Sequence, residues 1–443
     1  MSFSGLLIAG TLALTLTGPV QPAPRYVALG DSVAAGEGIG EGWTWNAGKQ
    51  HWVGGSTPGR WDTTFRPVPC HQTRQGYPWV VAARLGADLK DFACTGASGI
   101  DGILGVQPDR DLDGAQLGWT GAAPLAGAAP ANLAYDAPAP PSLVSLTLGA
   151  DDVDFAGLVG RCYKKYDGGC SHAPSRLDAV LQRQKANLAH TLQEIERRGA
   201  ADGRKPLVVQ TTYYDPFGSD TKCVDNRPEW PLAYLNAADL RFLAGAQVRM
   251  NQTIIDVAAE HGALVLDTDP LFADHLWCSP DPWVYGISIK RSDKHTMAPF
   301  HPMPAGQQAL GEAMATVFAS AAPVDAGTDV HVRVAHGALR FSSVSTPGEA
   351  AIVPAADLPG SVPPSSGFVV GSAYAVTTSA DFSGDVTIAL PSARAQQLFQ
   401  YLDGGWRPVP SAFDGGFVRG TVSSLSPVAL GTTSLNPAGR RAR

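Results

Sequence analysis

Residues 25–36 read Arg-Tyr-Val-Ala-Leu-Gly-Asp-Ser-Val-Ala-Ala-Gly. The apolar run Tyr26–Leu29 is typical of a short strand that is buried on both faces of a parallel sheet. Because Gly-Asp-Ser follows at once, Ser32 is expected at the carboxyl end of this strand, the edge where ligands bind in open α/β sheets. A plain turn with Ser32 as a helix N-cap would also explain the tripeptide. The Gly-x-Ser-x-Gly spacing of a nucleophile elbow is not present, which argues against an α/β-hydrolase.

The alternation of short β-rich runs with helical patterns continues to about residue 322. It predicts a parallel sheet covered by helices. Three helices are expected: one that starts with a capping box at Ser175 and stops at Gly199, one over Ala237–His261, and one from about Pro304. The further strand candidates are Leu89–Cys94, Leu143–Leu148, Leu207–Thr212 and Ala263–Leu266.

The composition and the hydrophobic periodicity of the chain change after Ala321-Ala322-Pro323. From Val330 onward the sequence contains no Cys or Lys, and strands of period two alternate with turns. We therefore expect a linker over residues 322–330 and a separate all-β sandwich over residues 331–443. The clearest strand candidates are Asp385–Leu390, Leu398–Leu402, Phe417–Val422 and Val428–Leu430.

Composition and charge exclude some classes of protein. Among 443 residues, 16% are charged and the net charge is −7, so a nucleic-acid binder, which needs a basic stripe, is not expected. The apolar run Leu6–Leu16 is too short to span a bilayer and matches the core of a signal peptide, although no Lys or Arg precedes it. Residues 1–23 are therefore expected to be a signal peptide on a secreted, extracellular protein without a transmembrane span.

Six cysteines support export independently. Their number is even, and none forms a Cys-x-x-Cys pair for zinc or redox chemistry. Six cysteines allow 15 pairings, so the sequence leaves the connectivity open. The simplest pattern is three successive disulfides in an oxidising compartment: Cys70 with Cys94, Cys162 with Cys170, and Cys223 with Cys278.

Three more short blocks lie at the ends of expected elements. They are Cys-Thr-Gly-Ala-Ser-Gly at 94–99, Leu-Gly-Ala-Asp-Asp at 148–152 and Phe-His-Pro at 300–302. Together with Gly-Asp-Ser they resemble the SGNH (GDSL-type) hydrolases, whose four blocks centre on a Ser, a Gly, an Asn and a His. The resemblance covers about residues 25–320 and is closest to the secreted actinobacterial esterases and lipases, which share three successive disulfides. It implies a three-layer α/β/α, flavodoxin-like hydrolase domain over residues 24–321.

The resemblance also implies the roles of individual residues. Ser32 would be the nucleophile, and His301 would take its proton and later deliver it to the leaving alcohol. The backbone N–H groups of Ser32 and Gly96 would hold the developing oxyanion. Asp31 is expected to fix the turn rather than to take part in the reaction. No metal or cofactor is implied.

Two departures from the family pattern bear on activity. Asp151 stands where the family has Asn, and an ionised carboxylate only accepts hydrogen bonds. Either Asp151 is kept protonated and donates, or the backbone donors suffice, or the protein is weakly active. Ala298 stands where many relatives place the acidic triad member, so its carbonyl is the candidate that orients His301 in a Ser-His dyad. Asp293 is a less favoured substitute.

Weaker signals are interpreted as structural. Asp109, Asp111 and Asp113 match the opening of a calcium loop, but Thr120 stands where that loop needs Glu, so an acidic surface loop is favoured. His71 lacks metal-like partners in the sequence and is expected to be structural.

The main hypothesis is a secreted serine esterase or lipase, a monomer that acts on ester or lipid substrates through an acyl-enzyme. One alternative is a polysaccharide acetyl esterase with a smaller acyl pocket. The other is a degenerate, non-catalytic protein whose β-sandwich binds a polymer or cell-wall surface.

Overall fold

The computed structural model describes most of the chain after the expected signal peptide. The described residues are 23–39, 44–46, 51–53, 70–107, 116, 140–164, 170, 174–216, 235, 237–277, 279–285, 298–358 and 369–432. The expected signal peptide up to residue 22, the acidic loop at 109–120 apart from Gln116, and Asp293 lie outside them. No helix in the described part is long and apolar enough to cross a membrane.

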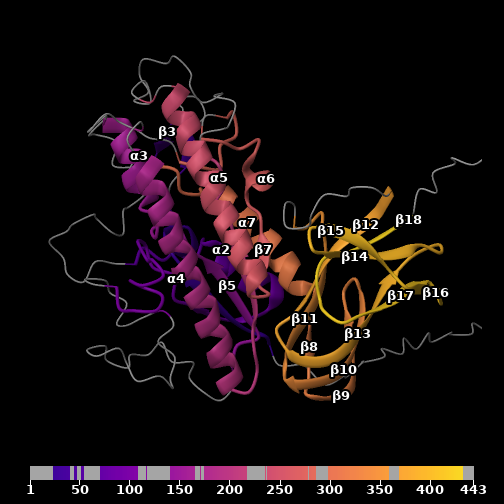
Figure 1. Cartoon of the computed structure of the whole chain (residues 1–443). Coiled ribbons are helices and arrows are strands. Elements are labelled where there is room, and N and C mark those ends of the chain that lie inside the picture. The colour runs from indigo at the N-terminus through magenta and orange to yellow at the C-terminus, as the bar shows by residue number, and fades with distance from the viewer. Residues whose placement is uncertain are drawn as a thin grey trace, which may run out of the picture.

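The first half contains the predicted parallel sheet, in the strand order β4-β1-β5-β6-β7. Figure 1 shows β5 and β7 of this sheet among the helices. All five predicted strands are confirmed. The second one ends three residues early because the chain leaves the ladder beyond Asp91, although Cys94 N–H still donates to Gly30 O at 2.9 Å. The bounds are β1 Arg25–Gly30, β4 Asp88–Asp91, β5 Leu143–Thr147, β6 Leu207–Thr211 and β7 Leu264–Leu266, beside a small hairpin of β2 Thr44–Asn46 and β3 His51–Val53.

Helices cover both faces of this sheet, as the three-layer prediction requires. The expected long helix begins at Pro174, so Ser175 lies inside its first turn and not at the cap. Gly199 does not stop it either: the helix runs to Ala201, and Gly203 then takes a left-handed φ of 83°. The helices are α1 Ser32–Ala35, α2 Tyr77–Leu85, α3 Phe155–Lys164, α4 Pro174–Ala201, α5 Ala237–Glu260, α6 Asp269–Phe272 and α7 Pro304–Ala319.

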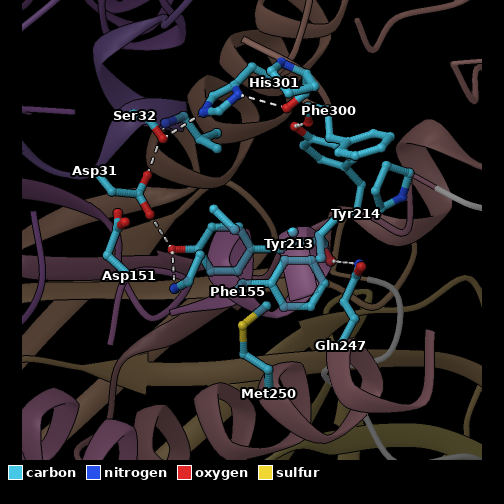
Figure 2. A pocket seen from close by; sticks show the side chains of 17 residues that line it. Asp31, Ser32, Asp151, Phe155, Tyr213, Tyr214, Gln247, Met250, Phe300 and His301 are labelled. Atoms are coloured by element: carbon cyan, nitrogen blue, oxygen red, sulfur yellow. Dashed lines mark hydrogen bonds between the residues drawn. The ribbon is translucent and has the colours of Figure 1, made fainter. Parts of the chain in front are cut away.

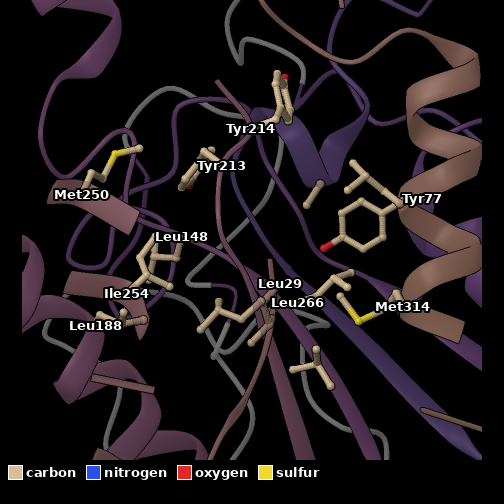
Figure 3. Packing of buried hydrophobic residues seen from close by; sticks show 14 of the residues in the cluster. Leu29, Tyr77, Leu148, Leu188, Tyr213, Tyr214, Met250, Ile254, Leu266 and Met314 are labelled. Carbon is tan, nitrogen blue, oxygen red and sulfur yellow. The ribbon is translucent and has the colours of Figure 1, made fainter. Parts of the chain in front are cut away.

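The core of this half lies on both sides of the sheet (Figure 3). On one side Leu188 of α4 and Ile254 of α5 pack against it, and on the other Tyr77 of α2 and Met314 of α7 do so. All four side chains are at most 1% exposed. Strands buried on both faces must be apolar throughout, and this is why the run at residues 26–29 could be recognised.

The second half is the predicted β-sandwich. Two antiparallel sheets, ordered β16-β17-β13-β10-β9 and β15-β14-β18-β12-β11-β8, share one apolar core. The expected linker over residues 322–330 is wrong: this segment forms most of β8 and the start of β9, because β8 pairs with β11 as an edge strand. The strands are β8 Ala321–Val324, β9 Gly327–Val334, β10 Gly337–Thr346, β11 Gly348–Pro354, β12 Val369–Thr378, β13 Asp381–Pro391, β14 Gln397–Leu402, β15 Gly405–Val409, β16 Ser411–Asp414, β17 Phe417–Val422 and β18 Val428–Thr432.

The sandwich contacts the α/β half at the amino edge of the parallel sheet, opposite Ser32 (Figure 1). Lys205, just before β6, donates its backbone N–H to Pro347 O at 2.9 Å, and its Nζ lies 2.6 Å from Asp381 Oδ1. Apolar side chains of β11 and β12, among them Val353, belong to the same buried cluster as the α/β core. The two halves therefore share a buried interface.

We expect Val353→Ala to lower the free energy of unfolding by about 2 kcal/mol, since two buried methyl groups are lost from this interface. Because Val353 is fully buried against the α/β half, the thermal loss of helical circular dichroism at 222 nm, which reports on the α/β half, should shift to lower temperature. The matched control is Val248→Ala on α5, where the side chain is 63% exposed and little change is expected. An unchanged temperature of the helical transition in Val353→Ala would show that the interface does not stabilise the α/β half.

Candidate active site

Ser32 stands at the carboxyl edge of the sheet, where the first strand turns into a short helix. Gly30 has a φ of 144°, and a Cβ there would lie 2.5 Å from Thr147 O, so only glycine fits. Asp31 caps α1, with its Oδ1 accepting the N–H of Val33 at 2.9 Å. Gln116 holds the turn from the other side by bonding both the N–H and the carbonyl of Gly30. The nucleophile candidate is thus on a turn that Asp31 helps to fix, as expected, and the N-cap of α1 is Asp31 and not Ser32.

His301 meets Ser32 directly. Its Nε2 lies 2.7 Å from Ser32 Oγ (Figure 2), which is hydrogen-bond distance for proton transfer. Nδ1 is bonded to Pro299 O at 3.1 Å, a contact that the sequence did not indicate. The carbonyl of Ala298, the expected orienting group, also acts on the imidazole, and its orienting role stays a prediction. It accepts the backbone N–H of His301 at 3.2 Å as well, in a turn where Phe300 has a left-handed φ of 66°.

The protonation of His301 suits a general base. Burial lowers the pKa of its imidazole below the ordinary value, while the charge of Glu37 and the carbonyls of Pro299 and Ala298 act in the opposite direction. A lowered pKa means that the neutral, proton-accepting form is present at neutral pH and is lost only under more acidic conditions. In a profile of kcat/KM against pH, the acidic limb, where activity falls as the base becomes protonated, should therefore lie below the pH at which an ordinary histidine titrates.

Two tyrosines that directly follow β6 support the site. Tyr213 Oη donates to Asp31 Oδ2 at 2.5 Å and accepts the N–H of Ala150 at 3.1 Å, so it joins the first and third sequence blocks. Burial raises the pKa of Asp31 to about 7, against the opposing hydrogen bonds of Tyr213 and Val33.

The second of these tyrosines bonds to the histidine loop, which is the segment 298–303 that carries His301. Tyr214 Oη donates to the carbonyl of Phe300 at 2.6 Å, one residue before His301, and its ring stacks on Phe272 with centroids 4.2 Å apart. Sequence reasoning missed both tyrosines. The available signal was that two aromatic hydroxyls come at once after a strand whose carboxyl end faces the same edge as Ser32.

The three predicted oxyanion donors differ in their surroundings. Within the described residues, neither the N–H of Ser32 nor that of Gly96 is used in another hydrogen bond, so both remain available. Gly96 sits in a turn with φ 81° just after Cys94. Asp151 lines the same pocket as Ser32 and His301. Next to it, Asp152 accepts the N–H of Gly99 at 3.1 Å, which links the second block to the third.

An apolar cavity of about 300 Å³ opens beside Ser32. In Figure 2 the Ser32–His301 pair lies on one side of the pocket, and Phe155 and Met250 lie on the other side, beyond Tyr213. The residues that line the cavity are Asp31, Ser32, Val33, Ala150, Asp151, Phe155, Ala156, Val159, Gly160, Tyr213, Tyr214, Pro216, Gln247, Met250, Pro299, Phe300 and His301. A pocket of this kind, apolar with a few convergent polar groups, is typical of a small-molecule site.

Two of the three expected disulfides are confirmed. They are Cys70–Cys94, with Cα atoms 4.4 Å apart, and Cys162–Cys170, with Cα atoms 4.7 Å apart. The first holds the segment that leads into Gly96, and the second closes the end of α3 beside the cavity. Cys223 and Cys278 lie outside the described residues, so their pairing stays a prediction.

Comparison with known proteins gives consistent matches over the α/β half. Residues 28–309 match the model of the GDSL-like Lipase/Acylhydrolase family. The chain is similar to a lipase of Streptomyces rimosus, with 26% identity over 69% of this chain and 92% of that protein. It is also similar to lipase 2 of Streptomyces coelicolor, with 25% identity over 68% of this chain and 91% of that protein.

Among solved structures, phospholipase A1 from Streptomyces albidoflavus NA297 aligns with 24% identity, a TM-score of 0.42, and coverage of 65% of this chain and 95% of that one. The family match ends inside α7, so the β-sandwich lies beyond it.

Proposed function

The chain belongs to the GDSL-like lipase and acylhydrolase family, and we propose that it hydrolyses carboxylic esters of medium to long acyl chains through Ser32 and His301. The observation that carries this proposal is the 2.7 Å contact between His301 Nε2 and Ser32 Oγ at the mouth of an apolar cavity. A Ser-His dyad needs a group that fixes the imidazole, and the carbonyl of Pro299 serves here.

The reaction follows from this geometry in two halves. His301 Nε2 takes the proton of Ser32 Oγ while Oγ bonds to the ester carbonyl carbon, and the same proton then goes to the leaving alcohol as the C–O bond breaks. Water attacks the resulting acyl-enzyme in the second half, with His301 taking its proton and returning it to Ser32 Oγ as the acid leaves. The carbonyl of Pro299 accepts from Nδ1–H throughout, so that Nε2 carries the lone pair in the resting state.

The carbonyl oxygen becomes negative in the tetrahedral intermediate and needs donors. Our candidates are the N–H groups of Ser32 and Gly96, which bond to no other group among the described residues. One such donor is worth about 3–4 kcal/mol where it has been measured. Asp151 lines the same pocket, and an ionised carboxylate there would repel the oxyanion.

The cavity favours a lipid-like acyl group over acetate. Its wall is formed by apolar and aromatic side chains of α3, α5 and the segment after β6, including Phe155, Val159 and Met250. Each methylene that enters such a wall contributes about 0.8 kcal/mol, whereas an acetyl group would leave most of the surface uncovered. This argues against the acetyl-esterase alternative, and the intact Ser32–His301 contact argues against a degenerate, non-catalytic protein.

Gly160 of α3 allows this assignment to be tested. It lines the cavity, and a Cβ added there would meet no atom within 4 Å, so a large side chain can enter the cavity without a backbone clash. Gly160→Phe should lower kcat/KM for p-nitrophenyl octanoate by about tenfold or more while p-nitrophenyl acetate changes little. The wild type should prefer the octanoate.

The matched control is Gly245→Phe on α5, an exposed position away from the cavity where a Cβ also meets nothing. It should leave the chain-length profile unchanged. A wild type that prefers acetate, or an octanoate rate that survives in Gly160→Phe, would place the acyl group elsewhere.

We also propose that the protein is secreted and monomeric. The two disulfides and the apolar run Leu6–Leu16 support export. For the β-sandwich, binding to a polymer or cell-wall surface remains our proposal, since it lies on the edge opposite Ser32 and leaves the cavity free.

A further inference from the structure

Glu37 is a buried carboxylate close to the dyad, and sequence analysis assigned it no role. It follows the C-cap of α1, and its side chain and backbone together are only 3% exposed. Its backbone N–H donates to the carbonyl of Ser32 at 2.9 Å. A buried carboxylate lowers the stability of the fold unless other groups pair with it or donate hydrogen bonds to it, so the presence of Glu37 here needs an explanation.

The carboxylate is compensated by groups from two other segments. Glu37 Oε2 lies 2.5 Å from His71 Nδ1 and accepts the hydroxyl of Thr95 at 2.6 Å. His71 and Thr95 each adjoin one cysteine of the Cys70–Cys94 disulfide, and Thr95 directly precedes Gly96. Glu37 therefore connects the segment of the nucleophile to the segment of the expected oxyanion donor.

The same part of the chain packs against the histidine loop. A Cβ on Gly38 would lie 2.5 Å from Cβ of Ala298, three residues before His301. The charges of Glu37 and His301 act on each other: the carboxylate raises the pKa of the imidazole, and the imidazolium lowers that of the carboxyl. Burial alone would raise the pKa of Glu37, but His71, His301 and Thr95 outweigh it, so the group is ionised at neutral pH.

We propose that Glu37 is a positioning residue of the hydrolase site, which provides the negative charge that a carboxylate triad member would otherwise supply to the His301 imidazolium. This inference rests on the proposed function of Ser32 and His301. The two groups have different roles. Pro299 O orients the ring, while Glu37 stabilises the protonated form of His301 through space and holds Thr95 in place. Stabilising the imidazolium lowers the barrier to proton transfer from Ser32.

Two titratable side chains change the pKa of His301 in opposite directions. Among the described residues these are Glu37, which raises the pKa of His301, and His71, which lowers it when His71 is protonated. Removing each charge should therefore shift the acidic limb of kcat/KM in opposite directions. A role confined to packing would not produce that pair of shifts.

The experiment measures kcat and the kcat/KM–pH profile of the full chain with p-nitrophenyl butyrate. We expect Glu37→Gln to lower kcat about tenfold at pH 8 and to move the acidic limb to lower pH, by up to about one unit. Glu37→Asp keeps the charge and should restore the limb. His71→Asn should move it to higher pH. Thr95→Val removes the hydroxyl without changing charge and should leave the limb in place.

An acidic limb that stays at the wild-type pH in both Glu37→Gln and His71→Asn would overturn the inference. If Glu37→Gln does not fold, the shift in His71→Asn decides the matter alone: a shift to higher pH supports the proposal, and no shift or a lower pH refutes it. Failure of the proposed function is distinguishable, because it would appear as a wild type whose hydrolysis does not depend on Ser32.

Discussion

Replacing Ser32 or His301 by alanine should lower kcat/KM for p-nitrophenyl octanoate by about 10⁴-fold or more, and the double variant should be little worse than either single one. The two residues act as a unit because Nε2 of His301 is 2.7 Å from Oγ of Ser32, and the attack requires both. The fold should persist, since neither side chain contributes to the buried apolar cluster.

The measurement is a pair of rate constants with a thermal unfolding curve for each variant. Ser342→Ala in β10 is the matched control, because it removes an exposed hydroxyl of the sandwich whose Oγ bonds only Asp385 O within the described residues. It should keep the wild-type rate. Wild-type turnover in Ser32→Ala would show that another group is the nucleophile.

Asp151→Asn should have the opposite effect and raise kcat/KM by about tenfold or more at pH 8. Asp151 lines the pocket of Ser32 and His301, at the position where the family pattern has Asn. An ionised carboxylate there can only accept hydrogen bonds and repels the oxyanion, whereas the amide donates. One added donor is worth up to about 10²–10³-fold in kcat, which sets the upper bound of the gain.

The gain should grow as the pH rises, because the amide of Asn does not ionise. The measurement is kcat/KM from about pH 5 to 10 for both proteins, which brackets the titration of the catalytic histidine. Asp154→Asn is the charge-matched control, since the Asp154 side chain is 58% exposed and pairs with Arg161. Loss of activity in Asp151→Asn at every pH would mean that the carboxylate has another role, and that the oxyanion lies elsewhere.

The strands and long helices could be predicted from sequence because their signals are local. A parallel strand covered on both faces is an uninterrupted apolar run, as in residues 26–29, and the order of elements then implies the layers. Ser32 and His301 could be predicted because each lies in a short block next to the end of an element, and the four blocks together resemble those of the SGNH hydrolases.

The errors came from features that depend on contacts between distant segments. Residues 322–330 look like a linker, but residues 322–324 pair with β11 and residues 327–330 pair with β10. The carbonyl of Pro299 reaches Nδ1 of His301 in a turn where Phe300 has a left-handed φ, and the sequence did not indicate this turn. Glu37 becomes conspicuous only when His71 and Thr95 are seen beside it.

The central claim is that Ser32 is a nucleophile activated by His301, and covalent labelling tests it most directly. The protein is treated with a fluorophosphonate probe, and the adduct is counted by intact mass and located by peptide mapping. We predict one adduct, on Ser32, that is absent in Ser32→Ala and forms far more slowly in His301→Ala. Ester hydrolysis by the wild type without an adduct on Ser32, or with the adduct on another serine, would contradict the account.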